Sequence, residues 1–272
     1  MPDSGIDTLA PVAGLDVTLA GGVLSVTIDR PESLNSLTAV VLAGIADAME
    51  RAATDARVKV VRLGGTGRGF CSGAGMSAED TGPSKKGVKT GTETITEINR
   101  TVRAITALPH PVIAVVHGPA AGVGVSLALA CDLVLASENA FFILAFTKIG
   151  LMPDGGASAL VAAAIGRVRA MRMALLPERL PAAEALSYGL VSAVYPAEDF
   201  HAEVDDIVAR VAAGPVVAFA KTKQAINAAT LTELDPTLER EFDGQVGLLR
   251  SADFREGASA FQQRRSPVFT DA

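Results

Sequence analysis

With 272 residues, 49% of them hydrophobic but only 4% aromatic, the chain can bury a core of Ala, Val, Leu and Ile in an α/β fold. Its net charge of −6 argues against a nucleic-acid partner, which would need clustered Lys and Arg. With only two cysteines, Cys71 and Cys131, we expect neither a disulfide framework nor a Cys-based metal site, and we expect a cytoplasmic location.

The first predicted elements are two strands, a helix and a third strand. Residues 15–29 hold two alternating runs separated by Gly21-Gly22, a pattern typical of a hairpin. Residues 38–53 show the apolar spacing of a helix, and Thr38 is placed to cap it. The β-branched run at 59–65 predicts the third strand.

The middle of the chain repeats the order of strand, turn and helix. Residues 112–116 predict a strand, 123–131 a helix and 133–136 another short strand. A helix at 182–188 precedes a last strand at 190–195. Short strands that alternate with helices favour parallel crossover connections.

Three other segments complete the outline. Residues 79–93 are polar and rich in glycine, so we expect a mobile loop there, which would act as a lid beside a site. Residues 200–265 carry helical periodicity and lack strand-like runs, which divides the chain into a core (1–199) and a C-terminal helical subdomain (200–272). We expect no export signal and no membrane partner, because charged or polar residues interrupt the apolar stretches.

Two glycine-rich turns after predicted strands carry the functional signal. Glycines recur through Gly64 to Met76, where the missing side chains let a ligand approach main-chain N–H groups. Gly118 to Asp132 leads from a strand into an apolar helix, whose N-terminal N–H groups favour negative charge. Neither segment has the spacing of a dinucleotide or P-loop site. The second segment predicts an oxyanion site, although a glycine run alone could also be a plain turn.

Both turns match motifs of a known family. Phe70 to Gly75 and Gly118 to Asp132 resemble signature segments of the enoyl-CoA hydratase/isomerase (crotonase) superfamily, and further matches, such as Gly150 to Gly156, cover nearly the whole chain. The resemblance implies the crotonase spiral of ββα units with a C-terminal helical part that packs in a homotrimer or a dimer of trimers. It also implies an acyl-CoA thioester as substrate, and no separate cofactor.

The resemblance assigns the oxyanion donors to the backbone N–H groups of Ala74 and Val123. Such donors stabilise the enolate of a thioester, and each is worth roughly 10²–10³ in rate. Substrate and CoA contacts carry over by resemblance to Ser33, Leu34, Ser36, Ser72, Gly73, Gly122, Phe146, Lys223 and Phe261.

One departure from the family pattern bears on the reaction. The two glutamates that hydratases of this family use align with Ser126 and Phe146, which cannot exchange a proton as a carboxylate does. Asp154, at a position that supplies a carboxylate in isomerases of the family, becomes the expected proton-transfer residue. The alternatives are that Asp154 only forms a turn, and that Glu79 or Asp80 reaches the site from the lid.

The sequence therefore predicts an enzyme that isomerises an enoyl-CoA double bond, and it looks most like the phenylacetate-pathway isomerases. Hydration and a noncatalytic acyl-CoA-binding role are the alternatives. No metal is expected, because the three histidines lack nearby partners of a ligand set. Cys71 is expected to fill space beside Phe70, and Asp132 to be structural.

Overall fold

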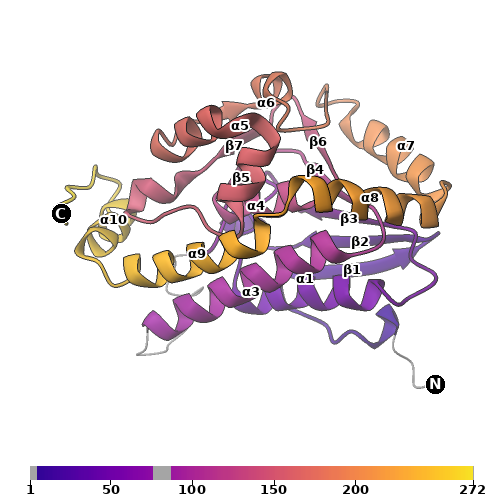
Figure 1. The fold of residues 1–272 in the computed structure, drawn as a ribbon, viewed down its shortest axis with the longest axis horizontal. Coiled ribbons are helices and arrows are strands. Elements are labelled where there is room, and N and C mark those ends of the chain that lie inside the picture. The colour runs from indigo at the N-terminus through magenta and orange to yellow at the C-terminus, as the bar shows by residue number, and fades with distance from the viewer. Residues whose placement is uncertain (1–4, 76–86, 272) are drawn as a thin grey trace.

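Six strands form the main sheet of the computed structural model, which describes residues 5–75 and 87–271 (Figure 1). β1 and β2 pair antiparallel, which confirms the hairpin predicted at Gly21-Gly22, and the other pairings in this sheet are parallel. In spatial order the strands are β1 (Leu15–Ala20), β2 (Val23–Ile28), β3 (Val60–Gly65), β4 (Val112–Val116), β6 (Leu133–Ser137) and β9 (Ala193–Tyr195).

A smaller sheet fixes the start of the helix that follows the second glycine turn. Its strands are β5 (Pro119–Ala121), β7 (Phe141–Ile143) and β8 (Leu180–Pro181). Gly122, at the N-cap of α4 (Val123–Ala130), donates its backbone N–H to Ile143 O of β7 at 2.9 Å. The sequence did not predict these strands, because runs of two or three residues show no alternation.

Helices cover both faces of the main sheet. In Figure 1, α1 and α3 run side by side over one face, where the larger apolar core lies. α7 covers the other face, where Phe200 and Val204 pack with Val60 of β3. The helices of the first part of the chain are α1 (Ala39–Ala52), α3 (Gly87–Ala107), α5 (Ala157–Leu175) and α6 (Ala182–Tyr188), with 3-10 turns η1 (Ile6–Thr8), η2 (Pro31–Ser33) and η3 (Ala145–Ile149). The C-terminal helices are α7 (Phe200–Ala212), α8 (Val216–Thr230), α9 (Leu234–Leu248) and α10 (Ala252–Gln262).

Helix α1 begins where the sequence predicts. Thr38 Oγ1 accepts a hydrogen bond from Val41 N at 3.2 Å and so satisfies one of the free N–H groups of the first turn. Leu42, Ile45 and Met49 are fully buried at spacings of three and four, which is the stripe that the periodicity indicated.

Helix α3 corrects the loop predicted over residues 79–93. Residues 87–93 are its first turns, whereas residues 76–86, and with them Glu79 and Asp80, lie outside the described residues. Ile95, Ile98 and Val102 are buried on one face of the helix. Tertiary packing of this face stabilises the helix, and its Gly- and Thr-rich start hid it from a reading of local propensity.

The last strand is shorter than predicted. Gly189 ends α6 in a left-handed conformation, so the chain turns through Leu190 and Val191, and β9 begins only at Ala193.

The helical character of the C-terminal part is confirmed. α9 lies against α3 and α5, and α10 lies against η3, so these helices pack on the core. The boundary at residue 199 stays a prediction. None of the helices in the described parts of the chain combines the length and the apolar character needed to cross a membrane.

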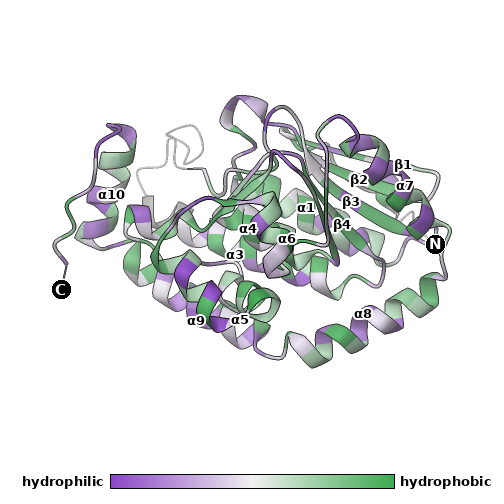
Figure 2. Cartoon of the chain, turned by 90° about the horizontal axis from the view of Figure 1, so that it is seen from above, coloured by the Kyte–Doolittle hydropathy of each residue, from purple (hydrophilic) through white to green (hydrophobic). Residues whose placement is uncertain are grey.

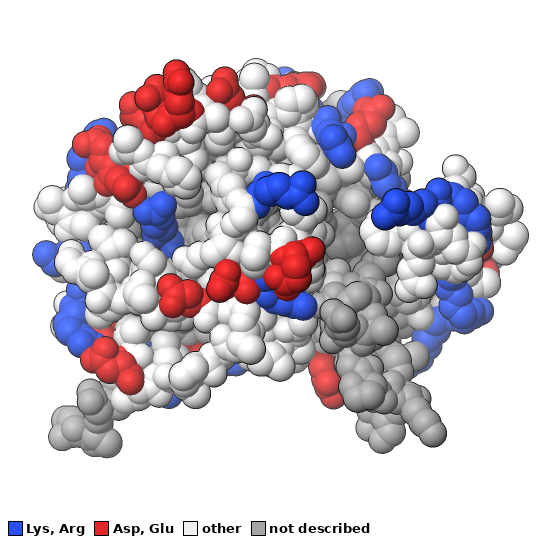
Figure 3. Space-filling view, turned by 180° about the vertical axis from the view of Figure 1, so that it is seen from behind, with Lys and Arg blue, Asp and Glu red and all other residues white. Residues whose placement is uncertain are grey.

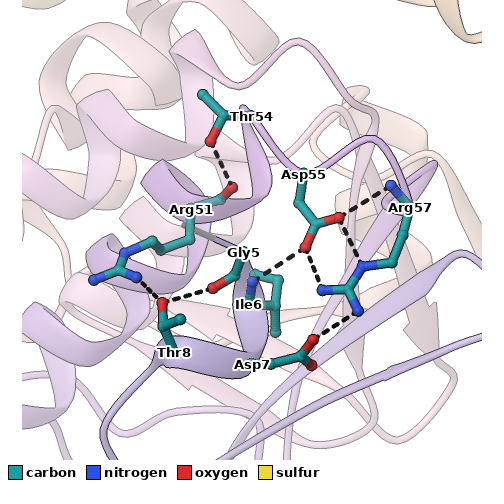
Figure 4. Close-up of polar contacts among 8 residues, drawn as sticks. All are labelled: Gly5, Ile6, Asp7, Thr8, Arg51, Thr54, Asp55 and Arg57. Atoms are coloured by element: carbon teal, nitrogen blue, oxygen red, sulfur yellow. Dashed lines mark hydrogen bonds and ion pairs between the residues drawn. The ribbon is translucent and has the colours of Figure 1, made fainter. Parts of the chain in front are cut away.

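A buried carboxylate holds the N-terminal segment in place (Figure 4). Asp55 accepts hydrogen bonds from Arg57 Nε at 2.9 Å, from Arg57 Nη2 at 2.7 Å and from Ile6 N at 3.1 Å. The side chain of Arg57, followed by the Ile6 N–H, holds the pKa of Asp55 well below its usual range. These bonds join η1 to the loop between α1 and β3.

Candidate active site

The two glycine-rich turns lie side by side. Cys71 N donates to Pro119 O at 3.1 Å, and Ala121 N donates to Cys71 O at 2.9 Å. This close approach requires glycine, because a Cβ on Gly124 would lie 2.6 Å from Cys71 O and one on Gly73 would lie 2.9 Å from Ala121 O. The backbone of the first turn is therefore packed against the start of α4.

This packing brings the predicted oxyanion donors into one neighbourhood. Val123 is the first residue of α4, where an N–H has no acceptor within the helix. A Cβ on Gly73, the residue before Ala74, would lie 3.5 Å from Val123 N. Within residues 5–75 and 87–271, neither amide donates a hydrogen bond to another protein group. The N–H at the start of α4, together with the N–H of Ala74 on the neighbouring turn, suits a developing negative charge.

Predicted substrate-binding residues surround the first turn. Ser72 N donates to Leu34 O at 3.0 Å, and Ser72 Oγ donates to Ser33 O at 2.9 Å. Ser36 Oγ donates to Ser33 Oγ at 2.9 Å. The structure thus brings together the segments 33–36 and 72–73, which the resemblance had named separately.

Asn35 supports this arrangement, and the sequence had not singled it out as a support. Its side chain is fully buried, donates to Thr66 O at 2.8 Å and to Gly69 O at 2.7 Å, and accepts from Arg30 N at 2.9 Å. Its φ of 59° is a conformation that Asn tolerates better than most residues. An Asn shortly after a proline turn is the signal that could have indicated this role.

Gly122 and Phe146 meet at the second turn. A Cβ on Gly122 would lie 3.6 Å from Phe146 Cζ, and Phe146 is only 7% exposed. An apolar ring therefore lies next to the start of α4. Ser126, the other residue at an aligned glutamate position, is fully buried and donates to Asp154 O at 2.8 Å.

Asp154 is buried in the turn before α5. One carboxylate oxygen, Oδ2, accepts from Gln245 Nε2 at 2.8 Å, and the other, Oδ1, has no hydrogen-bond partner among the described residues. Burial raises the pKa of Asp154 to about 7; the hydrogen bond from Gln245 opposes this effect, and the charge of Glu241 adds to it. A carboxyl group with this pKa can both accept and return a proton near neutrality.

Two residues of α9, which the sequence did not suggest, hold this turn. Glu241 accepts from Gly156 N at 2.6 Å and from Ser158 N at 2.8 Å, and so caps α5. Gln245 bonds to Met152 and Asp154. Both occupy positions on the buried face of α9, in step with the apolar residue Leu238. Polar residues at the apolar positions of an amphipathic helix were the signal that could have found them.

Other assigned residues have defined places. Lys223 Nζ lies 2.9 Å from Asp132 Oδ2 and 2.9 Å from Ile105 O, so its ammonium is already engaged within the chain. Asp132 Oδ2 also accepts from Val112 N at 2.7 Å, which agrees with the structural role expected of it. Phe261 is 67% exposed on α10.

The surroundings of Cys71 and the placement of possible metal ligands bear on cysteine and metal chemistry. Cys71 is fully buried, and burial raises the pKa of its thiol to about 12, so its side chain packs rather than reacts. In the described part of the chain, no group of three His, Cys, Asp or Glu side chains could hold a metal ion.

Comparisons with known proteins identify the family. Residues 18–272 match the family described as enoyl-CoA hydratase/isomerase. The 1,2-epoxyphenylacetyl-CoA isomerase of Escherichia coli (strain K12) is 39% identical over 249 residues, which cover 92% of this chain and 95% of that protein. The 2,3-dehydroadipyl-CoA hydratase of the same organism is 32% identical over 248 residues, which cover 91% and 94%. A crystal structure of an enoyl-CoA hydratase from Mycobacterium avium subsp. paratuberculosis K-10 is 74% identical, with a TM-score of 0.90 over 96% of this chain and 100% of that one. The chain belongs to the enoyl-CoA hydratase/isomerase family of enzymes.

Proposed function

We propose that this enzyme isomerises the double bond of an enoyl-CoA thioester, with Asp154 as the residue that transfers the proton. The observation that carries the proposal is a buried carboxyl group with one oxygen that has no hydrogen-bond partner among the described residues. Burial raises the pKa of this group to about 7. Its main-chain oxygen is bonded to Ser126, one turn along α4 from the free amide of Val123. The turn that carries Asp154 therefore contacts the helix whose first residue carries one of the proposed oxyanion donors.

The proposed reaction uses Asp154, the two backbone N–H groups and the substrate. The thioester oxygen of a 3-enoyl-CoA accepts hydrogen bonds from the N–H groups of Ala74 and Val123. The Asp154 carboxylate takes a proton from the α-carbon, and the electron pair of that C–H bond moves into a dienolate. The protonated Asp154 then returns the proton to the γ-carbon, which leaves the double bond between the α- and β-carbons. Atoms and charge balance, and Asp154 ends as a carboxylate.

Hydration by paired glutamates has less support from the residues present. Ser126 and Phe146 stand at the two positions where family hydratases carry glutamate, and both are buried. The Ser126 hydroxyl is already used as a donor to Asp154 O. No carboxylate at these positions activates water.

The region around α10 suits the charged end of the CoA group. Basic side chains gather on the lobe at the right of Figure 3, over α10 and the C-terminal segment, where Arg250, Arg255 and Arg264 are exposed. CoA carries several phosphate groups, which arginine binds well. The exposed ring of Phe261 on the same helix offers an apolar surface.

The proposal includes a homotrimer or a dimer of trimers in the cytoplasm. Val168 of α5 is 81% exposed and Val217 of α8 is 77% exposed. α8 lies at the rim of the molecule in Figure 2, and none of its residues is buried. Association with other copies would cover these apolar side chains. The two cysteines are free and buried, which suits a reducing compartment.

A panel of thioesters tests the proposed reaction. The protein is incubated in D₂O with 3-enoyl-, 2-enoyl- and dienoyl-CoA substrates, and the products are identified by mass spectrometry and NMR. We expect conversion of 3-enoyl-CoA to 2-enoyl-CoA with transfer of the α-hydrogen to the γ-carbon, and deuterium enters only to the extent that protonated Asp154 exchanges with the solvent before it returns the proton. A 3-hydroxyacyl-CoA as the only product would replace isomerisation by hydration. Binding without any turnover across the panel would support the noncatalytic role.

A further inference from the structure

Glu241 and Gln245 lie one helical turn apart on the buried face of α9, and both reach the turn that carries Asp154. Glu241 is 1% exposed and Gln245 is 2% exposed. Polar side chains buried to this degree are costly unless their groups are bonded. Among the described residues, the hydrogen bonds of these two side chains go to residues 152–158.

The orientation of the Gln245 amide is fixed by its other partner. Gln245 Oε1 accepts from Met152 N at 3.2 Å, and Nε2 donates to Met152 O at 3.0 Å and to Asp154 Oδ2 at 2.8 Å. A backbone N–H can only donate, so the amide oxygen must face Met152 N and the NH₂ group must face Asp154. The NH₂ group of Gln245 is therefore oriented to donate a hydrogen bond to this carboxyl group.

Glu241 places a second acidic group beside the same turn. Its carboxylate accepts from the N–H groups of Gly156 and Ser158 at the start of α5. Burial raises the pKa of Glu241, and these hydrogen bonds, together with the helix dipole, oppose that effect and favour the ionised form. The nearest described side chains to Gly155 of this turn are uncharged, namely Ile98 of α3 and Ser126 of α4. Among the described residues, Glu241 is the one charged group that acts on Asp154.

We propose that Glu241 and Gln245 are positioning residues that set the protonation of Asp154 by opposite effects, Gln245 favouring its carboxylate and Glu241 opposing it. The inference rests on the proposed role of Asp154 in proton transfer. In the proposed isomerisation Asp154 first takes and then returns a proton, so neither of its two protonation forms can be strongly favoured. The balance of the two neighbours on α9 provides this condition.

A direct titration tests the inference without relying on turnover. The protein is labelled with ¹³C at its Asp carboxyl groups, and the Asp154 signal is the one that Asp154→Asn removes. Gln245→Met keeps the length of the side chain but loses the donor, so the titration midpoint rises by about one pH unit or more. Glu241→Gln keeps the size but loses the charge, so the midpoint falls.

A matched control lies on the exposed side of the same helix. Glu239→Gln makes the same chemical change at a side chain that is 72% exposed and paired with Arg103, and it should leave the midpoint unchanged. If Glu241→Gln does not fold, the rise in Gln245→Met alone carries the test. Unchanged midpoints, or a fall in Gln245→Met, overturn the inference.

The pH profile of isomerisation separates this inference from the proposed function. The acid limb of kcat/KM should move to higher pH in Gln245→Met and to lower pH in Glu241→Gln. A purely structural role would lower Tm in both variants without opposite shifts. If the NMR midpoints move and the pH profile does not follow them, the inference stands and the catalytic role of Asp154 fails.

Discussion

Two aspartates in this protein are almost equally buried, yet their surroundings drive their ionisation in opposite directions. Asp55 is 7% exposed and Asp154 is 4% exposed. Asp55 receives the guanidinium of Arg57 and a backbone N–H, and its pKa lies well below the usual range. Burial raises the pKa of Asp154 to about 7, the nearby charge of Glu241 adds to this effect, and the neutral amide of Gln245 opposes it. The charged donor and the backbone donor of Asp55 outweigh the effect of burial and make it a fixed anchor, whereas the neutral donor of Asp154 does not offset burial and leaves an exchangeable acid.

Asp154→Asn should give the largest effect on activity. We expect kcat to fall by about 10²–10⁴-fold, the typical contribution of a general base, while acyl-CoA binding stays within a few-fold because the shape is kept. Steady-state kinetics and calorimetric binding of a CoA thioester measure the two quantities. Turnover near the wild-type rate would mean that Asp154 only forms a turn, so that it, like Asp55, would have a structural role and no role in proton transfer.

The pH dependence of the wild-type enzyme should be the next largest effect. The carboxylate of Asp154 is the base, so kcat/KM should be constant above its pKa of about 7 and fall tenfold per pH unit below it. Two units below that pKa, near pH 5, the loss is about a hundredfold. A profile that stays flat down to about pH 5 would contradict this assignment.

Asp154 should also lower stability as the pH rises. Its pKa is higher in the folded protein than the ordinary value of 3.8, so the folded state holds a proton that the unfolded state has lost between these values. Stability therefore decreases from about pH 4 to about pH 7, by an upper bound of about 4 kcal/mol. Asp154→Asn removes this penalty, and urea denaturation near pH 8 should show a variant more stable than wild type.

The sequence could predict the parts of the molecule whose signals are local. Thr38 and the stripe of Leu42, Ile45 and Met49 indicate α1 without reference to the rest of the chain. Asp55 and Arg57 are two residues apart, although their pairing was not foreseen. Helix α3 was missed because a distant partner contributes to its packing. A Cβ on Gly91, in its first turns, would lie 2.8 Å from Leu249.

The candidate site also has a part that local sequence patterns predict and a part that depends on residues distant in the chain. Its glycine turns carry a local pattern, since only small residues allow Gly73 and Gly124 to approach the opposite backbone, and they could be recognised from sequence. The hydrogen-bond donor to Asp154 could not, because Gln245 is 91 positions away along the chain. Nothing near Asp154 in the sequence shows that, among the described residues, its side chain accepts from a neutral amide of α9.

Asp55→Asn should reduce stability rather than activity. The amide cannot accept both bonds from Arg57 as well as the N–H of Ile6, so we expect a loss of about 1–3 kcal/mol in the free energy of unfolding. Asp55 contributes stability above the ordinary pKa of an aspartate, and this contribution is lost in acid as the pH falls toward the folded-state pKa. Chemical denaturation near neutral pH and in acid measures both effects. A kcat within about twofold of wild type at a temperature where the variant is folded would confirm that the anchor is separate from the site.

Asp7→Asn should give the smallest effect, and it sharpens the comparison because Asp7 shares Arg57 with Asp55. Asp7 lies 2.7 Å from Arg57, as close as Asp55 does, but its side chain is 60% exposed whereas that of Asp55 is 5% exposed. Water and salt screen an exposed pair, so its loss should change the free energy of unfolding by less than about 1 kcal/mol. Denaturation at low and high salt measures the difference, which should shrink further as salt is added. In a double-mutant cycle, the coupling between Asp55 and Arg57 should exceed that between Asp7 and Arg57. Equal couplings would mean that distance to a cation, and not burial combined with donors, sets the strength of a carboxylate anchor in this protein.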